Sequence, residues 1–291
     1  MSFCRIVLVW MFFIATMSAK PIIAVSIPMQ KEFIQKIVGE EYEVVCLIKP
    51  GVNPHDFEPK FSDIKQINQA IAYFTIGIES EEAWLKRFSA QNKAMKIYSS
   101  IEGIALINFT KEEHEHSYSH DHDHDDDEEH EDGDTHVWLS PKNAKVIAKN
   151  LYNGLKAINP RGSYEESFKA LIYEIDALDI QIKEILNPLP KGQKFVVFHP
   201  MLGYFARDYG LQEISLEIQG KSPKIKDMMK VVEVMKKEGL SIIFSQPEFS
   251  TKAAEFVAKE SGAKLGYFSP LETPWAENLL GFAKEIRKFK D

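Results

Sequence analysis

From Pro21 onward, short apolar runs alternate with longer segments that carry their apolar residues on one helical face. Short runs rich in Val, Ile and aromatic residues are typical of buried strands. In the first half, four runs predict strands at Pro21–Ile27, Glu43–Ile48, Ala72–Ile76 and Met95–Ser99. The segments between them predict helices around Met29–Val38, Ser62–Ala70 and Ser80–Phe88. Strands and helices that alternate in this way indicate a parallel sheet covered by helices.

The second half repeats this alternation of strands and helices. Four further runs predict strands at Phe195–Phe198, Glu213–Leu216, Ser241–Phe244 and Lys264–Phe268. Serine followed by proline is a helix-start signal, and it predicts helix starts at Ser140-Pro141 and Ser222-Pro223. Ser250 is a further candidate N-cap and predicts a third start. A last helix is expected from Ala276 to Phe289. The predicted fold class is therefore α/β, with two similar lobes that each contain a roughly four-stranded parallel sheet with helices.

A long amphipathic segment, Ser163–Leu186, lies between the two halves. Its apolar residues recur at spacings of three and four, at Phe168, Leu171, Ile172, Ile175, Leu178, Ile182, Ile185 and Leu186. This spacing predicts one continuous helix of about 24 residues that joins the lobes rigidly. The predicted domains are a first lobe at 20–160, the linking helix at 161–190 and a second lobe at 191–291.

The N-terminus has the layout of a secretory signal peptide. Arg5 precedes an apolar run from Ile6 to Ala15, and the small residues Ser18 and Ala19 follow. The run is too short to span a bilayer, so a retained membrane anchor is the weaker alternative. We expect cleavage after residue 19 and a periplasmic mature chain. That chain retains only one cysteine, Cys46, so a framework of disulfides is excluded. Cys46 is interpreted as a buried small hydrophobe.

A polar tract from Glu112 to Asp134 contains thirteen acidic residues and six histidines. The histidines are His114, His116, His120, His122, His124 and His130. The tract is too polar to bury a core, and we expect a disordered loop over 112–134. It is interpreted as an accessory, low-affinity collector of metal ions, or else as a solubilising insertion.

The formal net charge of the chain is −8, but its acidity is concentrated in this tract. Without the tract and the signal segment, the net charge is about +4, and the basic residues are dispersed. This distribution argues against nucleic-acid binding.

Only three histidines lie outside the tract: His55, His136 and His199. His55 lies in a loop rich in proline after the second predicted strand, and His199 directly follows a strand of the second lobe. Ligands of open α/β sheets bind beyond the carboxyl ends of the strands, where both residues are expected. Three imidazoles are a suitable ligand set for Zn²⁺ in a cleft between the lobes.

Three segments, PGVNPHDFEP, THVWLSPKNA and VFHPMLGYFARDYGL, resemble the signatures of the periplasmic metal-binding proteins of ABC importers. The similarity is greatest to the zinc-uptake branch, the ZnuA type, and extends from about Pro21 to the C-terminus. It implies two α/β lobes, a long linking helix and one metal bound in the cleft by His55, His136 and His199. It also implies that the chain is no enzyme and delivers Zn²⁺ to a membrane ABC permease with its cytoplasmic ATPase. A monomer is expected.

The sequence does not identify the fourth metal ligand. Many relatives supply an aspartate where this chain has Ser269, so Glu248, Gln246 or water is considered for the fourth position. Asp56 and Glu58, beside His55, are candidates to orient its second ring nitrogen. Alternative functions are a manganese- or iron-binding importer component and a zinc hydrolase, although the chain has no His-Glu-x-x-His motif. A surface-adhesin role, found in some members of this family, also stays open.

Overall fold

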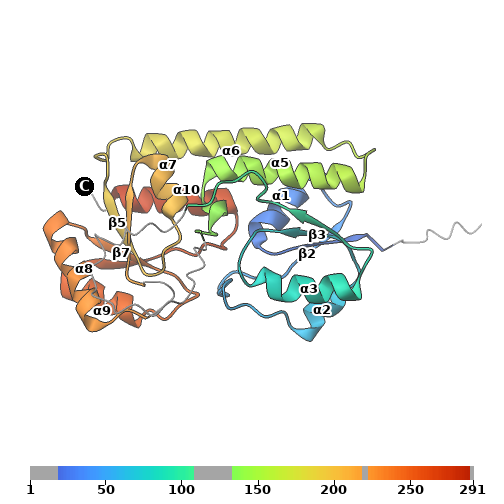
Figure 1. Cartoon of the computed structure of the whole chain (residues 1–291). Coiled ribbons are helices and arrows are strands. Elements are labelled where there is room, and N and C mark those ends of the chain that lie inside the picture. Colours follow the sequence, from blue (N-terminus) through green and yellow to red (C-terminus); the bar gives the residue numbers. More distant parts are fainter. Residues whose placement is uncertain (1–18, 108–132, 218–221, 289–291) are drawn as a thin grey trace, which may run out of the picture.

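The computed structural model describes residues 19–107, 133–217 and 222–288, which form two α/β lobes lying side by side (Figure 1). Nearly all of the predicted signal segment and of the acidic tract lie outside the described residues. Within the described part, no helix combines the length and the apolar character needed to cross a bilayer.

The first lobe contains a four-stranded parallel sheet with the strand order β2-β1-β3-β4. Its strands are β1 (Ile22–Val25), β2 (Glu43–Cys46), β3 (Ala70–Thr75) and β4 (Lys96–Ser99). Its helices are α1 (Pro28–Val38), α2 (Phe61–Ile67), α3 (Glu81–Gln91) and α5 (Pro141–Ile158), with the 3-10 helix η1 (Val137–Leu139) before α5. The central strands are mostly buried, as is usual for parallel sheets covered by helices.

The second lobe repeats this arrangement, with the strand order β6-β5-β7-β8. Its strands are β5 (Lys194–Val197), β6 (Gln212–Ser215), β7 (Ile242–Ser245) and β8 (Lys264–Tyr267). Its helices are α7 (Gly203–Tyr209), α8 (Ile225–Glu238), α9 (Lys252–Ser261) and α10 (Trp275–Lys288). The two sheets have equivalent strand orders and are parallel throughout. The predicted fold class, two similar α/β lobes, is therefore confirmed.

Helix α6 (Glu165–Leu186) extends over both lobes along the top of Figure 1. It packs against α1 and α5 of the first lobe and against α10 of the second. Its 22 residues agree with the predicted long helix, and its buried face consists of Leu171, Ile175, Leu178, Ile182 and Leu186. Burying each of these side chains stabilises the fold by about 1.5–3 kcal/mol. Rigid joining of the lobes by this helix stays a prediction, as do the domain limits.

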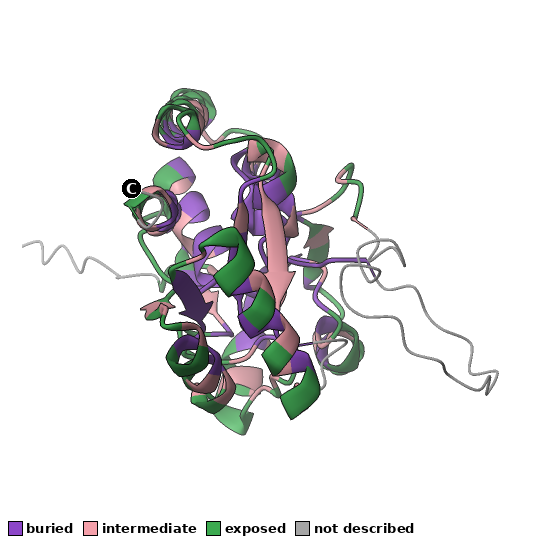
Figure 2. Ribbon diagram, turned by 90° about the vertical axis from the view of Figure 1, so that its left-hand side faces the viewer, coloured by how far each residue is buried: buried purple, intermediate pink, exposed green. Residues whose placement is uncertain are grey.

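The short helix η1 inserts a tryptophan between the lobes. Trp138 is fully buried, and its Nε1 donates to the carbonyl of Pro270 in the second lobe at 2.8 Å. Trp275 at the start of α10 donates in return to the carbonyl of Trp138 at 2.9 Å. Buried residues gather on the strands and the inward faces of the helices (Figure 2). The larger apolar core contains residues of both lobes, and a second, smaller core lies within the second lobe.

Some element boundaries differ from the prediction. Helix α2 ends at Ile67, because Ala70 already belongs to β3. Helix α8 begins at Ile225, after the predicted Ser222-Pro223 start. Cys46, at the end of β2, is only half-buried, and its Sγ lies 3.1 Å from the carbonyl oxygen of Ile48. Cys46, interpreted from the sequence as a buried small hydrophobe, is thus only partly buried against the core.

Candidate metal site

His55 lies in the loop between β2 and α2, and its main chain is fixed by local hydrogen bonds. The side chain of Asn53 accepts from the backbone N–H of His55 at 3.0 Å, which forms a local turn. The carbonyl oxygen of Pro54 accepts from the hydroxyl of Ser80 at 2.7 Å. The β3–α3 loop, which contains Ser80, therefore supports the loop that presents His55.

His136 immediately precedes η1 and is almost completely buried. Oδ1 of Asp134 lies 2.9 Å from both the backbone nitrogen and Nδ1 of His136. Asp134 is itself only 3% exposed, so a single buried carboxylate fixes both the turn and the ring of this histidine. The predicted solvated tract over 112–134 is therefore wrong at its last residue, which belongs to the folded site.

His199 follows β5 in the second lobe and is held by residues of the β7–α9 loop. The side-chain amide of Gln246 accepts from the backbone N–H of His199 at 3.2 Å and donates to its carbonyl oxygen at 2.9 Å. Phe249 stacks on the imidazole, with ring centroids 4.6 Å apart and an angle of 22° between the planes. These contacts fix both the main chain and the ring plane of His199.

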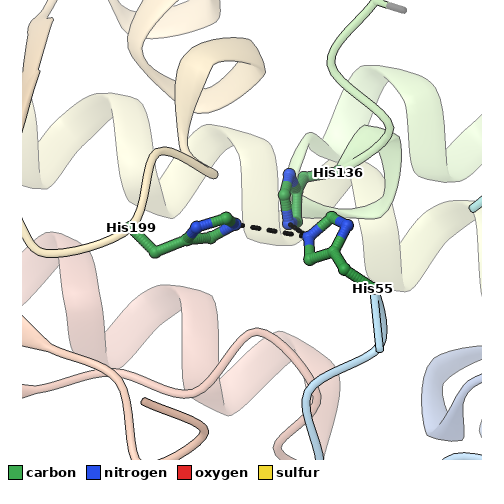
Figure 3. Close-up of side chains that lie close together, drawn as sticks. All are labelled: His55, His136 and His199. Carbon is green, nitrogen blue, oxygen red and sulfur yellow. Dashed lines mark hydrogen bonds between the residues drawn. The ribbon is translucent and has the colours of Figure 1, made fainter. Parts of the chain in front are cut away.

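The three imidazoles converge on one point between the lobes (Figure 3). Nε2 of His55 lies 3.2 Å from Nε2 of His136 and 3.3 Å from Nε2 of His199. Nitrogens bound to a tetrahedral zinc ion, at about 2.0–2.1 Å each, lie about 3.3 Å apart. Within the described residues, these three form the one group of metal-ligand side chains whose donor atoms lie within 4.8 Å of one another. The spacing matches three ligands of a single ion.

Each of the three histidines has a carboxylate near its Nδ1. Nδ1 of His55 lies 3.0 Å from Oε2 of Glu79, and Nδ1 of His136 is paired with Asp134. Nδ1 of His199 lies 3.2 Å from Oε2 of Glu217, an ion-pair contact whose alignment is not that of a hydrogen bond. A proton held on Nδ1 by a carboxylate leaves the lone pair of Nε2 free for a metal.

Burial and the neighbouring charges shift the pKa values of this site. Burial raises the pKa of Glu79, but the hydrogen bond and charge of His55 outweigh burial and lower it to about 2. Burial lowers the pKa of His136, against the opposing effect of Asp134. The lowered pKa of Glu79 favours its ionised carboxylate, and the lowered pKa of His136 favours its neutral imidazole, the form that binds a metal.

The side chains considered for the fourth position lie elsewhere. Gln246 uses its amide on the main chain of His199, as described above. Oε1 of Glu248 accepts from the hydroxyl of Ser269, and Glu248 is not in the group of converging ligand atoms. Asp56 and Glu58 are exposed, and Asp56 accepts from Asn53 at 2.8 Å. The prediction that Asp56 or Glu58 orients His55 is wrong, because Glu79 takes that position.

Glu79, Asp134 and Glu217 were missed by sequence reasoning. Asp134 stands two residues before His136, a spacing that allows a local turn, but its acidic neighbours concealed it. Glu79 and Glu217 reach their histidines only through the fold and carry no local signal. The six histidines of the tract lie outside the described residues, so their accessory role stays a prediction.

A buried carboxylate, Glu81, fastens the loop that carries Glu79. Its carboxylate accepts from the backbone N–H groups of Ile76 at 2.9 Å and Gly77 at 2.7 Å, and from the hydroxyl of Ser26. Gly77 has φ +83°, a conformation that favours glycine. Burial raises the pKa of Glu81 to about 7, although the hydrogen bonds oppose this. The loop thus turns tightly around one acidic side chain.

Sequence comparisons give the chain a family. Residues 23–286 match the family described as zinc-uptake complex component A, periplasmic. The zinc-binding protein AdcA of Streptococcus pyogenes serotype M3 is 33% identical over 253 residues, which cover 83% of this chain and 48% of that protein. The high-affinity zinc uptake system protein ZnuA of Bacillus subtilis is 32% identical over 248 residues, or 83% of this chain and 75% of that protein. The chain thus spans about half the length of AdcA.

Solved structures agree with this match. A crystal structure of ZnuA superposes with a TM-score of 0.82 at 33% identity, covering 92% of this chain and 98% of that one. A zinc-bound deletion mutant of ZnuA gives a TM-score of 0.80 at 33% identity, covering 92% of this chain and 97% of that one. A manganese-bound periplasmic protein from Candidatus Liberibacter asiaticus, 20% identical, shares the fold with a TM-score of 0.76. The chain belongs to the family of periplasmic zinc-uptake complex component A proteins.

Proposed function

We propose that this chain captures Zn²⁺ outside the cytoplasm and delivers it to an ABC permease driven by a cytoplasmic ATPase. The observation that carries this proposal is the convergence of His55, His136 and His199, with Nε2 separations of 3.2 and 3.3 Å. The zinc-binding relatives and the zinc-bound ZnuA structure support the same cargo. In this proposal a cleaved signal segment exports the chain, which works as a monomer.

The donor set favours zinc over the alternative cargoes. Manganese prefers oxygen ligands, whereas imidazole nitrogens suit zinc. Three nitrogens leave a fourth position on a tetrahedral ion for water or a carboxylate. Three protein ligands plus water also occur in zinc hydrolases. The family match, to a component of an uptake complex, favours binding and release over hydrolysis.

Calorimetric titration of the purified chain, residues 20–291, tests the proposal. We expect tight, single-site binding of Zn²⁺ and loss of that site in His55→Ala, His136→Ala and His199→Ala. Mn²⁺ added in competition should displace little of the bound zinc. Unchanged tight binding in two of the three variants would refute the assignment of the site, and preferential binding of Mn²⁺ would refute the choice of cargo.

A further inference from the structure

Helix α7 of the second lobe reaches the residue that holds His136. Tyr204, in the first turn of α7, is fully buried, and its hydroxyl donates to the carbonyl oxygen of Asp134 at 2.6 Å. The same hydroxyl accepts from the backbone N–H of Ile107 at 3.1 Å. Asp134 in turn donates its own backbone N–H to the carbonyl oxygen of Ile107 at 2.8 Å. One tyrosine hydroxyl therefore joins two segments of the first lobe to the second lobe.

The absence of a side chain at the neighbouring Gly203 leaves space for the carboxylate of Asp134. A Cβ atom at Gly203 would lie 3.0 Å from Oδ2 of Asp134, which is closer than ordinary van der Waals contact. Any larger side chain would therefore press on the carboxylate whose Oδ1 holds His136. The main chain of Asp134 is thus hydrogen-bonded to the first turn of α7, and its carboxylate lies close to the backbone of Gly203.

Helix α7 also continues from the loop that contains His199. The backbone N–H groups of Met201 and Leu202 donate to Oε1 of Glu213 at 3.1 and 3.0 Å, which fixes the connection from His199 to α7. The N-terminal end of α7 is therefore fixed relative to His199 through Glu213, and relative to His136 through Tyr204 and Asp134. The two histidines belong to different lobes but are aligned by one short helix.

We propose that Tyr204 is a positioning residue of the metal site, which holds Asp134 so that the ring of His136 faces His55 and His199. This inference rests on the proposed binding of zinc by the three histidines. Carboxylates that hold metal-binding histidines raise metal affinity, and their mutation typically costs ten- to a hundredfold. Tyr204 acts one contact further out, so its loss should weaken zinc binding by about tenfold.

Helix α7 itself offers a matched control. Tyr209 lies on the same helix, and its hydroxyl donates to Oδ1 of Asp179 in α6 at 2.9 Å, away from the three histidines. Tyr204→Phe and Tyr209→Phe each remove one hydroxyl that donates to an oxygen of another segment. Titration of the purified chain with zinc should show about tenfold weaker binding in Tyr204→Phe and an affinity within twofold of wild type in Tyr209→Phe.

A double-mutant cycle separates positioning from a general loss of stability. In an Asp134→Asn background, Tyr204→Phe should weaken zinc binding no further, because the group that it positions is already altered. The NMR signals of the ring nitrogens should also shift for His136 in Tyr204→Phe and stay in place for His55. Gly203→Ala provides a second variant that keeps the hydroxyl and crowds the carboxylate, and it should weaken binding as well.

The outcomes are distinguishable. The inference fails if Tyr204→Phe binds zinc as tightly as wild type, if it weakens zinc binding no more than Tyr209→Phe, or if its effect persists undiminished in the Asp134→Asn background. Those results, together with loss of binding in His55→Ala and His199→Ala, would leave the proposed function intact. Retained tight binding in the histidine variants would instead overturn the proposed function.

Discussion

Oε2 of Glu79 lies 3.0 Å from Nδ1 of His55, so a side chain of the β3–α3 loop contacts the ring of a histidine from the β2–α2 loop. The other oxygen of this carboxylate, Oε1, lies 3.3 Å from the donating hydroxyl of Thr135, next to His136. The Glu79 side chain therefore contacts both His55 and the residue next to His136. Its removal should affect the site more than its exposed position suggests.

We expect Glu79→Ala to weaken zinc binding ten- to a hundredfold, because His55 loses the acceptor that fixes its ring and its tautomer. Isothermal titration with zinc measures the effect. Glu82→Ala is the control, since Glu82 is an exposed acid in the first turn of the adjacent helix. Equal affinities of the two variants would show that Glu79 has no orienting role.

Two deletions that differ only in whether they include Gly133 and Asp134 test whether Asp134 contributes to zinc binding. Removal of residues 112–132 should leave zinc binding at the three histidines within a few fold of wild type. Removal of 112–134 should weaken it at least tenfold, because it also removes the carboxylate that holds His136. Zinc titrations of both proteins decide the point, and indistinguishable affinities would contradict the assignment of Asp134 to the site.

The unfolding free energy should depend on pH through the ionisation of Glu81. Burial raises its pKa from 4.5 to about 7, so the folded protein holds this proton more tightly than the unfolded chain does. The resulting stabilisation is full below pH 4.5 and is lost as the pH rises through 7. At 1.36 kcal/mol per pKa unit, the loss is on the order of 3 kcal/mol.

Glu81→Gln cannot titrate at this position and should lack that loss. Urea unfolding of the metal-free proteins at a series of pH values measures the difference in unfolding free energy between wild type and variant. Comparison with the variant cancels the contribution of other groups, including His136. A difference that stays constant from about pH 4.5 to 7 would contradict the raised pKa.

Ser140 links the N-terminus of α5 to the second lobe. Its Oγ accepts from the backbone N–H of Asn143 at 3.1 Å and donates to the buried carboxylate of Asp208 on α7. Ser140→Ala should lower the unfolding free energy by about 1–2 kcal/mol, because α5 loses its N-cap and Oδ2 of Asp208 loses the hydrogen bond from Ser140. Ser89→Ala, at an exposed position of α3, is the control and should cost less than about 0.5 kcal/mol.

The sequence pattern predicted the strands and the three histidines well, because both depend on local features. Buried strands consist of continuous apolar runs, and each of the eight predicted runs, from Pro21–Ile27 to Lys264–Phe268, overlaps a strand. His55 lies in the loop after β2 and His199 lies just beyond β5. The rule that ligands bind beyond the carboxyl ends of parallel strands therefore placed both residues on the same side of their sheets.

The carboxylates around these histidines could not be predicted in the same way. Asp56 is the sequence neighbour of His55, yet Glu79 approaches the ring because the β3–α3 loop folds over it. Asp134 looks like one more residue of a solvated acidic tract, although it is 3% exposed. Pairings of this kind depend on how loops meet in three dimensions, and burial of a single acid cannot be inferred from the composition around it.

His55 and His199 stand 144 residues apart in the chain, and they approach the same point from different lobes. An ion bound by both histidines would act as a removable cross-link between the two lobes. The metal-bound and the metal-free protein would then differ in how freely the two lobes move relative to each other. Under the proposed function, such a difference in stiffness would allow the ABC permease to distinguish the zinc-bound protein from the zinc-free protein without contacting the ion.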